Sequence, residues 1–190
     1  MSPRTKKQFA AIRSEKENNI QQTALRLFAS NGFESTSVSL IAKEAGISKG
    51  LMYNYFESKE ELLRKIILGG LGQFMEYLNI EDENNVQKQE LIVFIDGNLS
   101  VLKQQSDFYK LYFSLSFQPA VFAILEKDMM IIFEQLFGVF TNYYTRKGEE
   151  NPYVKTRYLL AVFDGIGMHY VIDTENFPLD GVRDMIVDLL

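Results

Sequence analysis

Apolar residues recur at three- and four-residue spacing along almost the whole chain, which is the period of an amphipathic α-helix. The strict alternation of Val, Ile or Thr with polar residues that marks a half-buried strand is absent from the sequence. Proline, which breaks helices, occurs only four times in 190 residues. The pattern therefore predicts an all-α protein of about nine helices.

The first predicted helix covers residues 15–31. Ser14 and Glu17 have the spacing of a capping box, in which each side chain bonds a backbone N–H group at the start of a helix. Gly32 follows the last apolar residue of this segment and is expected to end the helix.

Two shorter helices follow, with a tight turn between them. The first begins after the Thr36-Ser37 pair and stops at Gly46. Ser48 is expected to cap the second, over residues 49–55. Two short helices joined by so short a glycine turn form a helix-turn-helix.

Longer helices are predicted beyond this motif. Ser58 and Glu61 form another capping box and open a fourth helix that ends near Leu78. The remaining helices are expected over residues 86–104, 107–117, 119–146, 152–172 and 180–190. The polar run 81–85 predicts a flexible surface loop, and we expect two domains, residues 1–65 and residues 66–190.

Charge is divided unevenly along the chain, whose net charge is −5. Residues 1–65 hold 11 of the 20 Lys and Arg and 7 of the 25 Asp and Glu, a balance of +4, which leaves −9 for the remainder. A basic N-terminal third attracts phosphate, and an acidic remainder limits non-specific adhesion to DNA. The nucleic-acid-binding function is therefore expected in the first domain.

Several protein classes lack their usual residues here. The chain has no Cys and one His, His169, so a disulfide and a Cys-based zinc site are excluded, and we expect no metal and no cofactor. No apolar run is long enough to span a bilayer, and the N-terminus lacks the apolar region of a signal peptide, which predicts a cytoplasmic protein. An all-α enzyme is disfavoured because no nucleophile–base pair or phosphate loop is evident.

Residues 20–63 are similar to the TetR family of DNA-binding regulators. The residues that carry the resemblance are Gly32-Phe33, Thr36-Ser37-Val38, Ile41-Ala42, Ala45-Gly46-Ile47-Ser48-Lys49-Gly50, Tyr53-Asn54-Tyr55-Phe56 and Lys59-Glu60-Glu61-Leu62. The resemblance implies a helix-turn-helix repressor, not an enzyme, that binds a palindromic operator on double-stranded DNA as a homodimer and releases it when a small-molecule effector binds. Beyond residue 66 the likeness is confined to the helical layout.

The candidate DNA-binding residues lie on the second and third predicted helices and at the start of the fourth. They are Ser37, Ser48, Lys49, Gly50, Leu51, Tyr53, Asn54 and Lys59. Lys49 and Gly50 place a positive charge and a bare backbone at a helix N-terminus, where free N–H groups also attract phosphate.

The candidate DNA-binding residues are assigned their roles on different grounds. The family resemblance implies phosphate contacts for Tyr53 and Lys59, and Asn54 can pair with adenine in the major groove. The alternatives are that Ser37 is only a helix cap, Tyr53 a half-buried core ring and Lys59 a solvated side chain. We expect Leu51 or Met52, together with Phe56, to pack inward and Tyr53 and Asn54 to point outward.

The basic leader holds Arg4, Lys6, Lys7 and Arg13. Such an arm can enter a minor groove, as N-terminal arms do in other DNA-binding proteins. A disordered tail is the alternative that we favour.

Aromatic residues crowd the C-terminal region, with 11 Phe and 8 Tyr in residues 66–190. Apolar walls with a few polar groups, here Tyr hydroxyls and Gln118, are typical of ligand pockets. The candidate ligand-binding residues are Phe94, Tyr109, Tyr112, Phe113, Phe117, Phe133, Phe137, Tyr144 and Phe163. A solid aromatic core with no effector is the alternative, and a helical adaptor that binds only protein is a further one.

The last two helices offer a candidate dimer interface, because the resemblance implies that they pack against a second subunit. The residues are Tyr158, Ala161, Val162, Gly165, His169, Ile172, Val182, Ile186 and Leu189. For His169 a hydrogen-bonded interior or interface position is favoured over a metal ligand.

Overall fold

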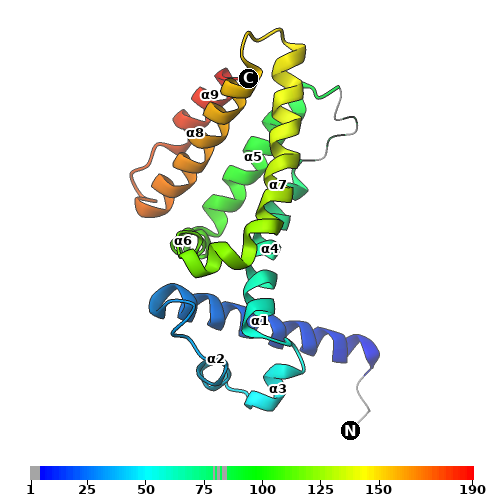
Figure 1. Cartoon of the computed structure of the whole chain (residues 1–190), viewed down its shortest axis with the longest axis vertical. Coiled ribbons are helices and arrows are strands. Elements are labelled where there is room, and N and C mark those ends of the chain that lie inside the picture. The colour runs from blue at the N-terminus through cyan, green and yellow to red at the C-terminus, as the bar shows by residue number, and fades with distance from the viewer. Residues whose placement is uncertain (1–4, 79, 81, 83–84) are drawn as a thin grey trace. The chain divides into compact units, whose positions relative to one another are not determined.

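The computed structural model describes residues 5–78, 80, 82 and 85–190, and over these ranges the chain forms nine α-helices and no β-strand (Figure 1). The helices are α1 Lys6–Asn31, α2 Val38–Glu44, α3 Lys49–Tyr53, α4 Lys59–Glu76, α5 Lys88–Gln104, α6 Ser106–Ser116, α7 Pro119–Arg146, α8 Pro152–Ile172 and α9 Leu179–Asp188. The all-α prediction is confirmed. None of the described helices is long and apolar enough to cross a membrane.

Helix α1 begins nine residues earlier than its sequence pattern predicted. Thr5 is the N-cap, its side chain accepts from the Gln8 backbone N–H at 3.3 Å, and the Gln8 side chain accepts from the Thr5 backbone N–H at 2.8 Å. The prediction that Ser14 and Glu17 open the helix was wrong, because they lie inside α1. The favoured prediction of a disordered tail was also wrong for Lys6, Lys7 and Arg13, because these residues lie in α1.

The chain divides into two compact units. The N-terminal unit contains the residues up to Gly69 together with Ser114–Ile124, and the C-terminal unit contains Gly70–Phe113 and Leu125–Leu190. The predicted domain boundary after residue 65 does not account for Ser114–Ile124. This segment comes later in the sequence but belongs to the N-terminal unit. The loop prediction for residues 81–85 falls partly on residues 81, 83 and 84, which, like Arg4, lie outside the described residues.

The N-terminal unit is built around the inward face of α1. Ile20, Ala24, Leu25 and Phe28 of this helix are fully buried. The rest of the unit contributes buried side chains to the same core, from helices α2 to α4 and, for Phe56, from the segment between α3 and α4: Ile41, Ala42, Met52, Phe56, Leu62, Leu63 and Ile66. Helix α1 packs against α2, and α2 packs against α3. The short helices are therefore held by tertiary burial, since helices of five and seven residues are unstable alone.

The segment Ser114–Ile124 joins this unit through polar contacts as well. Gln118 lies between α6 and α7, and its side-chain amide donates to the Phe28 carbonyl at 3.3 Å. Its carbonyl oxygen accepts from the Phe33 backbone N–H at 3.0 Å. The Arg64 guanidinium donates to the Ile124 carbonyl at 2.6 Å. The two Gln118 bonds satisfy backbone groups at the end of α1, so Gln118 is a structural residue of this unit.

The C-terminal unit has a core that is rich in aromatic rings. Phe94 of α5 lies at its centre, with ring centroids 5.0 Å from Phe74, 5.9 Å from Phe140 and 6.0 Å from Phe163. Helix α9 packs against α5 and α8, and Figure 1 shows α8 and α9 side by side. Arg183 of α9 binds both carboxylate oxygens of Asp96 on α5, at 2.7 and 2.8 Å.

Candidate DNA-binding surface and ligand cavity

The turn between α2 and α3 is formed by local hydrogen bonds. The Ser37 side chain accepts from the Leu40 backbone N–H at 3.1 Å, and the Ser48 side chain accepts from the Leu51 backbone N–H at 3.1 Å. Gly46 has φ +69°, a conformation that a residue with a side chain adopts only at a cost. The predicted caps and glycine turn are therefore found where the sequence placed them.

Helix α3 separates a buried face from an exposed one. Met52 and Phe56 are buried in the core of the N-terminal unit. Five of the candidate DNA-binding residues on or beside this helix are exposed, and Leu51 is half-buried; the exposed ones are Ser48, Lys49, Gly50, Tyr53 and Asn54. Tyr53 is 48% exposed, so about half of this residue is open to solvent. The expected inward and outward faces of α3 are confirmed.

Lys59 has partners within the protein. Its ammonium group donates to the carbonyl of Phe33 at 2.8 Å and to that of Glu34 at 3.3 Å. The ammonium nitrogen also lies 4.3 Å from the centre of the Phe33 ring, a cation–π contact. Sequence reasoning offered a phosphate contact or a solvated side chain, and it missed this link between α4 and the loop after α1, because the contact joins residues 26 positions apart.

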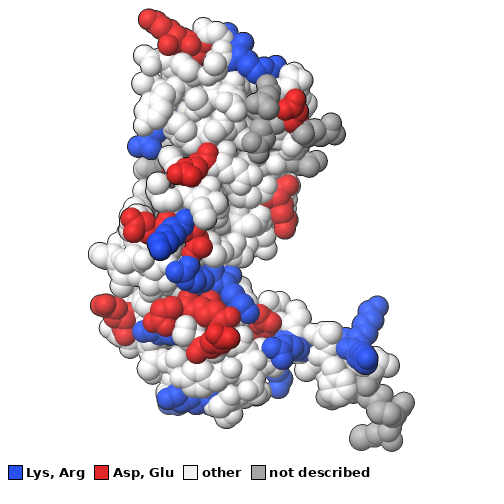
Figure 2. All heavy atoms as spheres, turned by 45° about the vertical axis from the view of Figure 1, so that its right-hand side comes forward, with Lys and Arg blue, Asp and Glu red and all other residues white. Residues whose placement is uncertain are grey.

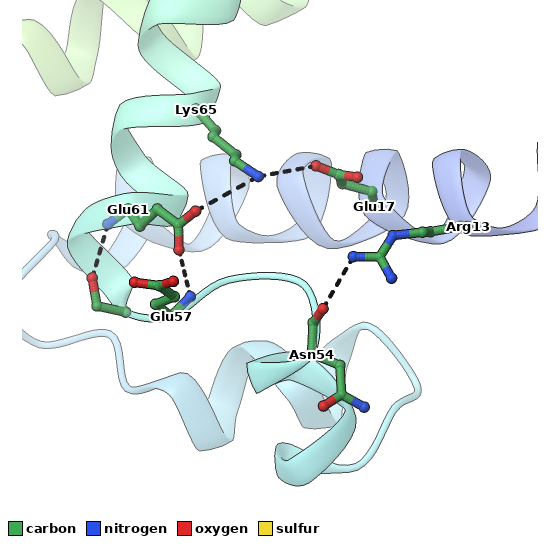
Figure 3. Close-up of polar contacts among 7 residues, drawn as sticks. Arg13, Glu17, Asn54, Glu57, Glu61 and Lys65 are labelled. Atoms are coloured by element: carbon green, nitrogen blue, oxygen red, sulfur yellow. Dashed lines mark hydrogen bonds and ion pairs between the residues drawn. The ribbon is translucent and has the colours of Figure 1, made fainter. Parts of the chain in front are cut away.

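Arg13 connects the extended start of α1 to the end of α3. Its guanidinium donates to the Asn54 backbone carbonyl at 3.2 Å and lies 5.1 Å from the centre of the Tyr55 ring. Figure 3 shows Arg13 directed at this carbonyl while the Asn54 side chain points away from it. The backbone of Asn54 is thus fixed from α1, and its side-chain amide remains exposed.

Acidic side chains gather on another face of the same unit. Lys65 pairs with Glu17 at 3.4 Å and with Glu61 at 3.6 Å, and Glu61 also accepts from the Glu57 backbone N–H (Figure 3). Figure 2 shows acidic side chains clustered on the drawn face of this unit, with basic ones at its lower edge and near the start of α1. The positive balance of residues 1–65 is therefore not spread evenly over the surface.

The C-terminal unit contains a cavity of about 200 Å³. It is lined by residues of α4, α5, α6, α7 and α8: Gly70, Leu71, Phe74, Asn98, Leu99, Leu102, Tyr109, Tyr112, Phe113, Met129, Ile132, Phe133, Leu136, Leu160, Phe163, Asp164 and Gly167. The lining is predominantly apolar and aromatic. An apolar wall with few polar groups is typical of small-molecule sites.

Five of the nine candidate ligand-binding residues line this cavity: Tyr109, Tyr112, Phe113, Phe133 and Phe163. The other four lie elsewhere. Phe94 is buried behind Phe163, and Phe137 packs on Phe133 and Tyr153. Tyr144 is fully buried, and its hydroxyl donates to the Leu189 carbonyl at 3.0 Å, while Phe117 is 72% exposed in the N-terminal unit. Periodicity alone could not separate cavity rings from core rings.

Three polar side chains of the lining have surroundings that the sequence did not predict. Asn98 is 4% exposed, and its amide donates to the carbonyls of Phe74 at 3.1 Å and Phe94 at 2.8 Å. Burial raises the pKa of the Tyr109 hydroxyl, with a further contribution from Tyr77. Desolvation by the surrounding protein also raises the pKa of Asp164, although part of this residue is exposed to solvent.

Helix α8 has apolar residues on two opposite sides. Leu159, Leu160, Ile166, Tyr170 and Val171 pack inward in the core. On the opposite side an outer stripe runs along the helix at alternating four- and three-residue spacing: Val154, Tyr158, Ala161, Gly165, Met168 and Ile172. A contiguous exposed apolar stripe is typical of a surface that another protein covers.

The candidate dimer residues divide between this outer stripe and the interior of the unit. Tyr158, Ala161, Gly165 and Ile172 belong to the outer stripe, with Tyr158 55% and Ile172 70% exposed. The others lie off the stripe: Ile186 is buried in the core, Val162, Val182 and Leu189 pack against the core, and His169 is exposed. The interior position for His169 was therefore wrong, and its place in a dimer interface stays a prediction. The free surface of α9 is mainly acidic, with Asp180, Asp184 and Asp188 around Met185.

Comparison with known proteins places this arrangement in a family. The sequence model of the family described as bacterial regulatory proteins, tetR family, matches residues 20–66. An uncharacterized HTH-type transcriptional regulator of Bacillus subtilis, YuxN, is 33% identical over 165 residues, which are 83% of this chain and 54% of the relative. The chain belongs to the TetR family.

Two further comparisons extend the likeness to the fold. The fatty acid metabolism regulator protein of Bacillus subtilis is 36% identical over 85 residues, 44% of this chain and 43% of the relative. The chain thus spans about half the length of these curated relatives or less. A crystal structure of the transcriptional regulator FadR from Bacillus subtilis in complex with stearoyl-CoA matches with a TM-score of 0.70 and 21% identity, over 90% of this chain and 95% of that one. It shows the same fold.

The segment matched by the TetR-family model contains every candidate DNA-binding residue, because these lie between Ser37 and Lys59. The cavity and the outer stripe of α8 lie beyond it. The family match therefore bears on the N-terminal unit alone.

The contacts of Lys59 generate a prediction for stability. Lys59→Met keeps the side-chain stem over Phe33 but removes the charged donor from two carbonyls, which should lower the free energy of unfolding by about 1–2 kcal/mol. Lys43→Met, at an exposed position of α2, is the matched control and should change it by less than about 0.5 kcal/mol. Urea titration of both variants measures the difference. Equal stability of the two variants would mean that the Lys59 contacts are not structural.

Proposed function

We propose that this TetR-family chain is a cytoplasmic transcriptional repressor that binds a palindromic operator as a homodimer and is released by a small, largely apolar effector. In this proposal the N-terminal unit binds DNA, and the C-terminal unit binds the effector and the second subunit. The observation that carries it is the two-sided α3, anchored by Met52 and Phe56 and exposed along its opposite face.

The exposed face of α3 supplies the contacts that DNA requires. Lys49 is the first residue of the helix, so its charge and the neighbouring N–H groups attract a phosphate. Gly50 has open space where a side chain would be, which allows close approach of a backbone. The Asn54 amide can bond an adenine edge, and the half-buried Leu51 can contact a thymine methyl group.

The other candidate residues take supporting roles. Ser37 and Ser48 cap α2 and α3, and both are exposed, so each can also contact phosphate. The Tyr53 hydroxyl is a further phosphate donor. An ammonium group has three N–H donors, and Lys59 uses two of them on carbonyls, which leaves one for DNA.

The dimer is supported by the outer stripe of α8. Its spacing repeats every seven residues, which is the pattern by which two helices interlock side chains. Covering this stripe with a second copy would bury the exposed rings and methyl groups of Tyr158 and Ile172. A two-fold dimer presents two reading helices, and these fit successive major grooves when they are about 34–36 Å apart.

The release mechanism follows from how the chain connects its two units. Helices α4, α6 and α7 each line the cavity with some residues and continue into the N-terminal unit with others. A ligand that favours one arrangement of these helices also biases the DNA-binding helices, and by linkage DNA and ligand oppose each other to the same degree. That a FadR with this fold is known with stearoyl-CoA supports a small-molecule effector here.

For the DNA contacts we expect Lys49→Ala to weaken binding by a similar factor for all duplex sequences. It should also reduce the slope of log affinity against log salt concentration by about one, because one phosphate contact is lost. Asn54→Ala should instead reduce discrimination at one base pair by about 1–3 kcal/mol. Fluorescence anisotropy with duplexes at several salt concentrations separates the two effects.

Lys103→Ala, at an exposed position of α5 in the C-terminal unit, is the matched control and should leave the salt slope unchanged. A salt slope that is the same for Lys49→Ala and the unaltered chain would contradict the phosphate role of Lys49.

For the dimer we expect Tyr158→Glu to place two like charges in the outer stripe and to weaken self-association at least about tenfold. Analytical ultracentrifugation should find the unaltered chain at twice its mass of 21.9 kDa and the variant at lower mass. Val93→Glu changes an equally exposed residue of α5 off the stripe and should remain dimeric. A monomeric unaltered chain at micromolar concentration would rule the dimer out.

A further inference from the structure

The polar side chains that line the cavity of the C-terminal unit include no cation, and this limits the class of ligand that the cavity can bind. Among the described residues that line it, none is Lys, Arg or His. Its polar side chains are Asn98, Tyr109, Tyr112 and Asp164. An anionic head group would therefore leave water without a cationic partner on the lining, which is costly for an ion.

Asn98 is the most informative of these side chains. It is buried, and both of its hydrogen bonds use the amide nitrogen as donor, to the carbonyls of Phe74 and Phe94. Those two bonds fix which end of the amide is the oxygen. Among the described residues no group donates to Asn98 Oδ1. Buried polar atoms nearly always have a partner, so this oxygen calls for a hydrogen-bond donor.

Asp164 adds a second acceptor, on the α8 side of the cavity. In the described part of the chain no ion pair neutralises its carboxylate. Arg157 lies over the ring of Phe133, 5.6 Å from its centre, and it is not part of the lining. The cavity thus favours a neutral donor or a cation over a second negative charge.

The size of the cavity limits the body of the ligand. At about 200 Å³ it is somewhat larger than the roughly 150 Å³ apolar cavity that admits benzene. Rings of Phe113 and Phe163 form part of the wall. One aromatic ring with a short side chain matches this volume and surface.

We infer that the effector is a compact aromatic or similarly apolar molecule whose head group carries an N–H or O–H donor, and not a carboxylate or phosphate. Asn98 Oδ1 accepts from that head group, and Asp164 adds attraction when the head is a protonated amine. This inference rests on the proposed function, because it assumes that the cavity is the effector site. Its ligand class differs from the acyl-CoA bound by the FadR of the same fold.

Four compounds with one phenyl body test the inference on the full chain: ethylbenzene, 2-phenylethanol, phenethylamine and phenylacetate. Dissociation constants come from calorimetry at pH 7, supported by the thermal shift that binding produces. We expect 2-phenylethanol and phenethylamine to bind about three- to tenfold tighter than ethylbenzene, the factor for one net hydrogen bond, and phenylacetate to bind most weakly.

Two substitutions assign the effect. Asn98→Leu removes the acceptor at similar volume. It should lower the affinity for 2-phenylethanol relative to that for ethylbenzene by about three- to tenfold. Asp164→Asn should lower the affinity for phenethylamine relative to 2-phenylethanol by about two- to fivefold, because only the amine loses a charge partner. Asn18→Leu, at an exposed position of α1, is the matched control and should leave both ratios unchanged.

The possible results distinguish a failure of the ligand-class inference from a failure of the proposed DNA-binding function. If phenylacetate or ethylbenzene binds as tightly as the donors, the cavity is a ligand site but the donor requirement is wrong. If none of the four compounds binds at millimolar concentration, the cavity does not accept ligands of this class and the inference fails. DNA binding is judged independently, by the salt slope of Lys49→Ala. Should Asn98→Leu not fold, the ranking of the four compounds on the unaltered chain still decides.

Discussion

The burial of Met52 and Phe56 is the constraint on which the DNA-binding surface depends. Helix α3 has only five residues, too few to be helical in isolation. Its direction is therefore set by these two side chains, which are buried in the core formed by α1, α2 and α4. Because they point inward, Lys49, Tyr53 and Asn54 must point outward. A reading surface is thus a consequence of packing.

Polar contacts between distant residues stabilise the helices around this core. Arg13 fixes the backbone of Asn54, Lys59 binds the carbonyls after α1, and Gln118 satisfies a donor and an acceptor at the same end of α1. Gln118 comes from the junction of α6 and α7, helices that also line the cavity. The chain itself therefore connects the cavity to the scaffold of α3, which is the connection that the proposed regulation by a small molecule requires.

The sequence predicts those features that depend on local chemistry. The caps Ser37 and Ser48 and the glycine turn at Gly46 follow from residue type and spacing alone, and so do the two faces of α3. The start of α1 does not, because Thr5-Gln8 and Ser14-Glu17 both have capping-box spacing and only tertiary structure decides between them. Two caps of equal local quality cannot be ranked from sequence.

Long-range placement accounts for the remaining differences. Phe94 and Phe163 are both aromatic residues on helices of the same unit, yet one lies in the core and the other on the cavity wall. Lys59 and Gln118 act on residues that are distant in sequence, and nothing local to them indicates these partners. Asn98 was not a candidate at all, since a single polar residue in an apolar helix is informative only once its burial is known.

The central claim is that the outward face of α3 reads DNA as one half of a symmetric pair. The most direct test is selection of bound duplexes by the full chain from a random-sequence pool at low ionic strength. The account predicts enrichment of a two-fold symmetric sequence whose half-sites are centred about one helical turn, 34–36 Å, apart. Recovery of no sequence above the starting pool would contradict it.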